Sequence, residues 1–177
     1  IAESKNLLDA SEFAFEASSQ LEKSSPPSAT FPEVRRQITE MWITNTQVNF
    51  CAKAYPTVPS GHPDAPVLSV LGTFMRNGFL HRNIREQGGA YGGGASHDGN
   101  IAAFRFFSYR DPRLLDTLHD FDSAIDWLLK AQHESIMLEE AILSVIAGLD
   151  KPASPAGEAK RHFNECLFER TAEHREA

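Results

Sequence analysis

The sequence is poor in cysteine, contains no long apolar run and has no excess of positive charge. Its two cysteines, Cys51 and Cys166, lie far apart, so they give neither a disulfide framework nor the spacing of a zinc finger. No stretch approaches the ~20 consecutive apolar residues of a membrane-spanning helix. Acidic residues outnumber basic ones by 24 to 17, and the net charge of -7 argues against nucleic-acid binding, which usually needs a basic surface.

The residues that are present favour one folded domain. A length of 177 residues is usual for a single domain, and 41% of the residues are hydrophobic, which is enough to build a core. The sequence starts at Ile1 rather than Met, and the charged and apolar regions of a signal peptide are not visible. We therefore expect residues 1–177 to be a single, truncated domain of a larger protein.

Residues 47–55 have the two-residue period of a β-strand. Val48 and Phe50 share one side with two alanines, and Cys51 lies on the other side among polar residues. This alternation predicts a strand with one buried face. No neighbour in the sequence would activate the thiol of Cys51, so we expect a core residue there.

Residues 101–109 predict a second strand. Phe106 and Tyr109 belong to opposite faces, and both faces are bulky, so this strand should be central in its sheet. We expect a hairpin within residues 88–109 that turns near residues 97–100, where Asp98-Gly99 suits a tight turn.

Five segments have the period or the boundaries of helices. The first predicted helix lies within residues 7–23 and starts near Ser11, the second spans residues 64–80, and the third starts at the N-cap pair Asp111-Pro112. The fourth covers residues 137–149, and the fifth starts at Ser154-Pro155. Residues 24–28 predict a loop, and residues 33–45 fit a strand or a helix. Strands among substantial helices predict an α+β fold, in which a mostly antiparallel or mixed sheet is packed by helices.

Five of the eleven glycines lie within residues 88–94. The segment has no Gly-Lys-Ser/Thr and precedes a strand, which argues against a phosphate-binding loop. Arg85 and Tyr91 bracket its first glycines. Glycine lets a ligand approach the backbone, and both side chains can donate hydrogen bonds to an oxygen that gains charge. The alternative for Arg85 is an ordinary surface ion pair, for example with Glu86.

The sequence offers no complete metal site and no evident nucleophile. None of the seven histidines belongs to an H-x-x-E-H or H-E-x-x-H motif, and a zinc site needs three or four converging ligands. His162 precedes Cys166 by four residues on a predicted helix, where packing is favoured over metal binding. Ser108 lacks a surrounding G-x-S-x-G and is interpreted as a packed strand residue.

Six short segments share their order and spacing with one known family. They are Asn45 to Phe50, Ala52 to Tyr55, Leu80 to Gly92, Phe107 to Pro112, Leu149 to Pro152 and Ser154 to Gly157. In this order they resemble the C-terminal part of the presequence proteases, a branch of the insulinase (pitrilysin) family of zinc metallopeptidases. The resemblance extends from about residue 40 to the end, and residues 1–40 resemble the family only loosely.

The resemblance implies an insulinase-type domain (LuxS/mitochondrial processing peptidase-like). Members of the family have four related α/β domains in two halves that close around unfolded peptides, and zinc lies on an H-x-x-E-H motif in the first domain. The last domain supplies an arginine and a tyrosine that reach the substrate from the opposite half, and Arg85 and Tyr91 match these positions. Gly88, Gly89 and Gly92 would let the peptide lie against the backbone.

The H-x-x-E-H motif is absent from this chain, so the resemblance implies a non-catalytic, substrate-binding domain of a zinc metalloendopeptidase that degrades unfolded peptides. Zinc would belong to the parent enzyme and not to this fragment. The implied partners are the N-terminal half of the same polypeptide and unfolded peptides, with no nucleic acid and no membrane. The implied compartment is the bacterial cytoplasm or the matrix or stroma of a mitochondrion or chloroplast. The alternative is a scaffold or subunit domain of a catalytically inactive relative.

We expect the isolated chain to bind no catalytic zinc and to cleave no peptide, because no set of three ligands is evident in its sequence. Metal analysis after dialysis and a quenched-fluorescence peptide assay measure the two properties. Stoichiometric zinc together with cleavage that a chelator abolishes would refute this expectation.

Overall fold

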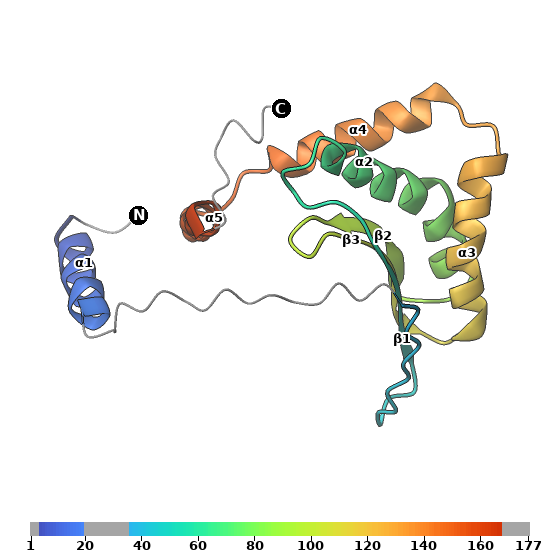
Figure 1. Cartoon of the computed structure of the whole chain (residues 1–177), viewed down its shortest axis with the longest axis horizontal. Helices are drawn as coiled ribbons and strands as arrows, with labels where there is room; N and C mark the ends of the chain where they lie inside the picture. The colour runs from blue at the N-terminus through green and yellow to red at the C-terminus, as the bar shows by residue number, and fades with distance from the viewer. Residues whose placement is uncertain (1–3, 20–35, 168–177) are drawn as a thin grey trace. The chain divides into compact units, whose positions relative to one another are not determined.

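The computed structural model describes residues 4–19 and 36–167. Residues Thr44–Pro152 form one compact unit, which contains a sheet and the helices that pack on it (Figure 1). Two further helices, α1 (Ser4–Ser19) and α5 (Pro155–Leu167), belong to the other unit. In the described part of the chain, no helix combines the length and the apolar character that crossing a bilayer requires.

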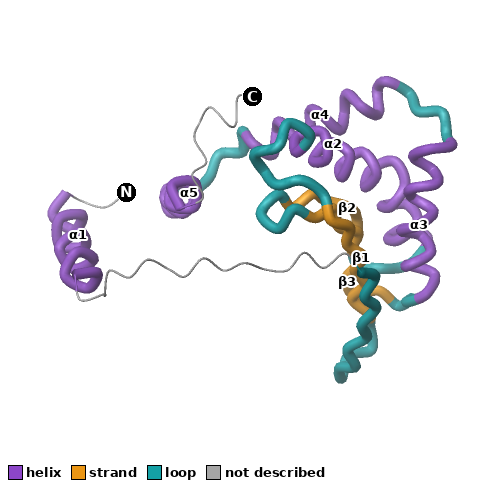
Figure 2. Tube along the Cα trace, viewed as in Figure 1, coloured by secondary structure: helices purple, strands orange, loops and turns teal. Residues whose placement is uncertain are grey.

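The sheet has three antiparallel strands in the order β1-β3-β2. Figure 2 draws these strands in orange beside the helices in purple. The strands are β1 (Asn49–Pro56), β2 (Gly92–Asp98) and β3 (Ala103–Asp111). β3 is the middle strand, as the bulky residues on both of its faces predicted. The α+β class and the antiparallel sheet are likewise confirmed.

The hairpin predicted within residues 88–109 is formed by β2 and β3. Its loop covers residues 99–102 and is longer than the tight turn expected for Asp98-Gly99 alone. The Asn100 N–H donates to the Asp98 carboxylate at 3.1 Å, which is the local hydrogen bond that makes aspartate favourable at a turn. Ala102 adopts a φ of 50° to complete the reversal.

One face of the sheet carries the core of this unit. Two consecutive helices, α2 (Ala65–Met75) and the π-helix η1 (Arg76–Gln87), pack on β2, and α3 (Leu115–Lys130) packs on β1. Phe106 of β3 and Phe121 of α3 are almost fully buried, with ring centroids 5.7 Å apart. Burying a side chain of this size stabilises a fold by roughly 1.5–3 kcal/mol, so this layer supplies much of the stability.

The buried face of β1 is the one that carries Cys51. The thiol belongs to the core cluster, which confirms the expected core position, whereas Phe50 is 66% exposed and Ala52 is also exposed. The period of two identified the strand and its two faces. The packing of α3 on β1 decided which face is covered, and that contact is remote in sequence.

The helix predicted for residues 64–80 continues to Gln87. From Arg76 it is a π-helix, whose wider turns break the 3.6-residue period, and the sequence pattern therefore fades after Leu80. Leu80 and Ile84 are fully buried in this segment. Arg85 consequently lies on a helix and not in a glycine loop.

The predicted helix start at Asp111-Pro112 is wrong, because α3 begins at Leu115. Asp111 is the last residue of β3 and is fully buried. Its carboxylate accepts the Arg113 N–H at 2.9 Å and the Thr117 hydroxyl at 2.8 Å. These bonds hold the strand end beneath the first turn of α3, which a side-chain cap at the helix start would not do.

The remaining helices follow the prediction more closely. α4 (Ser135–Leu149) packs on α2, and α5 starts at Pro155 as expected. α1 starts at Ser4 instead of near Ser11. Residues 36–45 form neither a strand nor a helix, although both were considered. The predicted loop at 24–28 and the ends of two predicted segments, 20–23 and 33–35, lie outside the described residues.

We expect the thiol of Cys51 to be unreactive in the folded protein. The side chain is only 4% exposed, and burial raises the pKa of its thiol, while the Ser108 hydroxyl acts in the opposite direction. In a Cys166→Ser variant at pH 8, Ellman's reagent should modify Cys51 only after denaturant is added. In the matched Cys51→Ala variant, the exposed Cys166 should react at once.

The same raised pKa gives the protein an alkaline dependence of stability. The contribution of the neutral thiol is fully present below the ordinary cysteine pKa of ~8.5 and is lost as the pH rises through the raised value. The advantage of the wild type over Cys51→Ala in free energy of unfolding should therefore shrink between pH 7 and about pH 10. A constant difference, or rapid modification of native Cys51, would contradict the assignment.

Candidate functional site

Arg85 and Tyr91 lie on the two sides of a short turn that joins η1 to β2. The Arg85 carbonyl ends the helix by accepting the N–H groups of Gly88 and Gly89, the latter at 3.1 Å. The Ala90 N–H donates to the Ile84 carbonyl at 3.1 Å, in a bond typical of helix C-termini. The turn thereby reverses the chain and leaves both predicted site residues exposed.

The Arg85 side chain makes no ion pair with any residue that the structure describes. Glu86, the candidate partner from the sequence, instead has its Oε1 3.3 Å from Nδ1 of His81. The proposed local pair between Arg85 and Glu86 is therefore not formed. The guanidinium is exposed and keeps its five N–H donors for a ligand.

Tyr91 is exposed but held in place. Its N–H donates to the Arg110 carbonyl at 3.3 Å, and its ring centroid lies 5.6 Å from that of Tyr109. The Arg110 guanidinium lies over the same ring, 5.8 Å from its centroid. Such a cation–π contact stabilises an exposed pair by about 0.5–1 kcal/mol. Tyr91 thus has a supported ring and a 63% exposed surface.

A β-bulge places Tyr109 and Arg110 beside Tyr91. Between the paired residues Asn49–Asp111 and Cys51–Ser108, the single residue Phe50 faces the two residues Tyr109 and Arg110. Arg110 adopts a φ of 50°, which is left-handed and costs a non-glycine residue on the order of 1–2 kcal/mol. The extra residue turns Asp111 into the core while the two preceding side chains stay exposed.

Two of the predicted glycines pack closely against the chain itself, Gly88 against backbone and Gly92 against the end of the Tyr109 side chain. A Cβ at Gly88 would lie 2.5 Å from the Ile84 carbonyl oxygen and would overlap the Arg113 guanidinium. A Cβ at Gly92 would lie 2.5 Å from Cζ of Tyr109. Gly89, by contrast, is exposed and has a φ of +78°, which glycine adopts without strain. Their suggested contact with a peptide stays a prediction.

Arg113, which the sequence did not single out, ties the turn to the core. Its guanidinium donates to the Asn83 carbonyl of η1 at 3.2 Å and to the Asp120 carboxylate of α3 at 2.9 Å. It also packs against Gly88. The sequence around Arg113 does not predict this role, because its hydrogen-bond partners are remote in sequence.

The other candidates from the sequence do not form a reactive centre. His97 and His133 each have Nε2 3.0 Å from a backbone carbonyl, of Val58 and Leu128 respectively. Nε2 of His162 lies 3.7 Å from Sγ of Cys166. Across residues 4–19 and 36–167, no three His, Cys, Asp or Glu side chains converge as metal ligands, so the described residues do not fit a zinc site. Ser108 is buried, as its interpretation as a packed residue requires.

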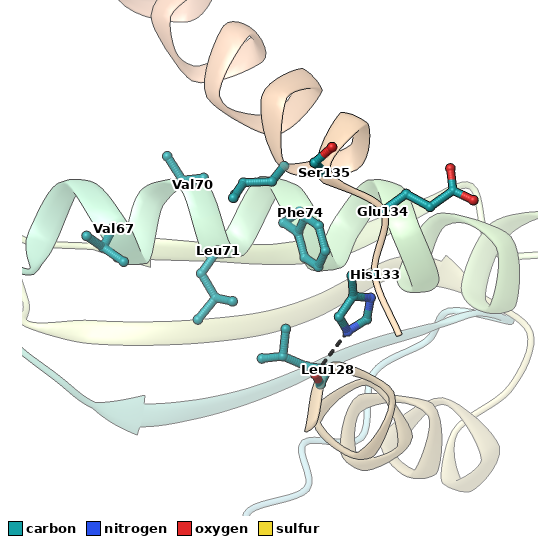
Figure 3. A pocket seen from close by; sticks show the side chains of 9 residues that line it. Val67, Val70, Leu71, Phe74, Leu128, His133, Glu134 and Ser135 are labelled. Carbon is teal, nitrogen blue, oxygen red and sulfur yellow. Dashed lines mark hydrogen bonds between the residues drawn. The ribbon is translucent and has the colours of Figure 1, made fainter. Parts of the chain in front are cut away.

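An apolar cavity of about 330 Å³ lies between α2, the end of α3 and the start of α4 (Figure 3). Val67, Leu71 and Leu138 contribute to its wall, and His133 lies near Leu128 at one side. None of the predicted site residues lines it. The cavity is therefore separate in its residues from the turn that carries Arg85 and Tyr91.

The fold and the turn define an α+β domain with an exposed arginine and tyrosine around a glycine-rich reversal. The model of one family, described as the PreP C-terminal domain, matches residues 39–177. This chain belongs to that family, which confirms the resemblance found in its motifs.

Three relatives are mitochondrial presequence proteases. The protein of Xenopus tropicalis is 39% identical over 160 residues, which cover 81% of this chain and 15% of the relative. That of Kluyveromyces lactis is 43% identical over 119 residues, 67% of this chain and 12% of the relative. That of Danio rerio is 36% identical over 169 residues, 89% of this chain and 16% of the relative. The aligned part of the chain thus covers only about a sixth of each relative at most.

We expect Gly88→Ala to destabilise the fold by about 1–3 kcal/mol, because its added methyl group would press on the Ile84 carbonyl and displace Arg113. Gly148→Ala is the matched control. Gly148 lies in α4, where an added methyl group meets no atom within 4 Å, and alanine there should stabilise the helix by up to about 1 kcal/mol. Urea unfolding measures both changes, and equal effects in the two variants would contradict the packing role of Gly88.

Proposed function

We propose that this chain is the substrate-binding, C-terminal domain of a zinc metallopeptidase related to the presequence proteases, and that Arg85 and Tyr91 hold the peptide substrate. The observation that carries this proposal is the exposure of both side chains on the two sides of one hydrogen-bonded turn, with the arginine free of ion pairs among the described residues. Membership of the PreP C-terminal domain family supports the peptidase context.

The two side chains offer complementary hydrogen-bond donors. The guanidinium of Arg85 is a permanent cation with donors in a planar fork, and the phenol of Tyr91 donates one O–H. Both can donate to the carbonyl oxygen of a bound peptide and to the negative charge that develops there during hydrolysis. Such donors act most strongly when the site is closed to water and when they bind the transition state better than the ground state.

The peptide could bind as an additional strand. β2 begins immediately after Tyr91 and is an edge strand of the sheet. An extended peptide added to such an edge is held by backbone hydrogen bonds, which do not depend on the identity of its side chains. This mode suits an enzyme that degrades many unfolded peptides.

The zinc of such an enzyme would lie outside the described residues, which contain no set of three ligands. We place the parent polypeptide in the mitochondrion, since the relatives cited above are named as mitochondrial enzymes. Its N-terminal half would face this domain across the substrate.

We expect Arg85→Ala and Tyr91→Phe, introduced into the full-length protein, each to lower kcat/KM by roughly 10²–10³, the typical loss for one donor in a dry site. The loss should fall on kcat if the contact forms only in the transition state, and on KM if the ground-state peptide is held equally. Steady-state kinetics on a quenched-fluorescence peptide measure both parameters.

Arg82→Ala provides the matched control, because Arg82 is also exposed on η1 and lies outside the proposed site. It should retain near-normal turnover. If Arg85→Ala and Tyr91→Phe also keep normal turnover, and Arg85→Ala lowers the melting temperature, the arginine supports the fold and the scaffold alternative is favoured.

A further inference from the structure

We propose that Arg110 is a specificity-determining residue of the peptide site and makes that site favour an acidic side chain next to the peptide group held by Tyr91. This inference rests on the proposed function of Arg85 and Tyr91. Arg110 lies in one of the segments that carry the resemblance, Phe107 to Pro112, but neither the sequence nor the resemblance assigned it a role.

The position of Arg110 is fixed by three independent features. Its backbone is the left-handed member of the β-bulge, its carbonyl accepts the Tyr91 N–H at 3.3 Å, and its guanidinium lies over the Tyr91 ring. β-bulges re-aim side chains and are common beside functional sites. Here the bulge directs a cation onto the tyrosine that is proposed to bind the substrate.

The charge of Arg110 is not neutralised by the part of the chain that the structure describes. The carboxylates near the ends of β2 and β3 have other partners: Asp98 pairs with Arg105 at 3.3 Å, and Asp120 pairs with Arg113 at 2.9 Å. Asp111 is fully buried and binds the Arg113 N–H and Thr117. Arg85, at the other side of the turn, likewise makes no ion pair in this region. Arg85 and Arg110 therefore lie on the turn and the bulge beside Tyr91 without an ion pair among the described residues, while the carboxylate of Glu86, next to Arg85, contacts His81 at 3.3 Å.

A peptide whose backbone reaches Tyr91 must place a neighbouring side chain near this cation. An acidic side chain gains an attraction there that its amide counterpart lacks. The pair would be partly exposed, so the preference should be modest and should weaken as salt screens it. An arginine also offers a planar fork that matches a carboxylate, which lysine does not.

The experiment compares two series of quenched-fluorescence peptides that differ only by Glu or Gln at one position, moved along the sequence one residue at a time. In the full-length enzyme at low ionic strength, kcat/KM should be roughly two- to five-fold higher for Glu at one position, the range expected for an exposed ion pair. The ratio should approach one in about 1 M salt, where the screening length is about 3 Å. A ratio of one at every position at low salt would overturn the proposal without any variant.

Two variants at Arg110 distinguish the effect of its charge on the substrate from its support of the Tyr91 ring. Arg110→Gln should reduce the Glu/Gln ratio to about one, and Arg110→Lys should retain part of it. Arg105→Gln is the control: it removes the same charge from the same strand, about 16 Å away along the strand, and should leave the ratio unchanged. An unchanged ratio in Arg110→Gln, or an equal drop in Arg105→Gln, would refute the proposal.

The outcomes also distinguish this inference from the proposed function. If Arg85→Ala and Tyr91→Phe leave kcat/KM normal for the Gln peptides, the proposed function fails. If those variants are impaired but Arg110→Gln lowers kcat/KM equally for Glu and Gln peptides, Arg110 only supports the Tyr91 ring and the specificity role fails. A thermal melt of each variant identifies any general loss of folding.

Discussion

The buried carboxylate of Asp111 and the neighbouring Arg113 hold together the parts of the domain that meet at the end of β3. Asp111 binds the Arg113 backbone and the Thr117 hydroxyl of α3. The Arg113 guanidinium reaches Asp120 of α3 and the Asn83 carbonyl of η1. Only the Asp111 carboxylate is fully buried, and a hydrogen bond to such a charged group typically contributes about 1.5–3 kcal/mol. The position of the turn after η1 depends on this network.

The exposed site is a consequence of the same arrangement. For Asp111 to enter the core, β3 must contain the bulge in which Tyr109 and Arg110 face Phe50. The bulge leaves these two side chains beside Tyr91. Strain in the Arg110 backbone is thus offset by buried hydrogen bonds one residue further on. The β-bulge in β3 therefore serves both the stability of the domain and the proposed contact with the peptide.

Local sequence patterns predicted which helices and strands form in this unit better than the residues at which they begin and end. The bulk on both faces of residues 101–109 indicated a central strand, and Asp98-Gly99 indicated the hairpin. The end of η1 at Gln87 was missed because a π-helix does not keep the 3.6-residue period. Asp111-Pro112 had the signature of a helix start. In the structure Asp111 instead ends β3, and its carboxylate accepts hydrogen bonds from the Arg113 N–H and the buried Thr117 hydroxyl.

The sequence by itself determined the α+β class, the family and the candidate pair Arg85 and Tyr91, since these depend on periodicity and on motifs that lie close together along the chain. Only the tertiary structure decided that the Cys51 face of β1 is the buried one, that Glu86 pairs with His81 and leaves Arg85 available, and that Arg110 lies over Tyr91. Arg110 and Tyr91 are nineteen residues apart along the chain (110 minus 91). The antiparallel pairing of β2 with β3, which the sequence predicted as a hairpin, and one extra residue in a bulge bring them together, and the bulge leaves no periodic signal in the sequence.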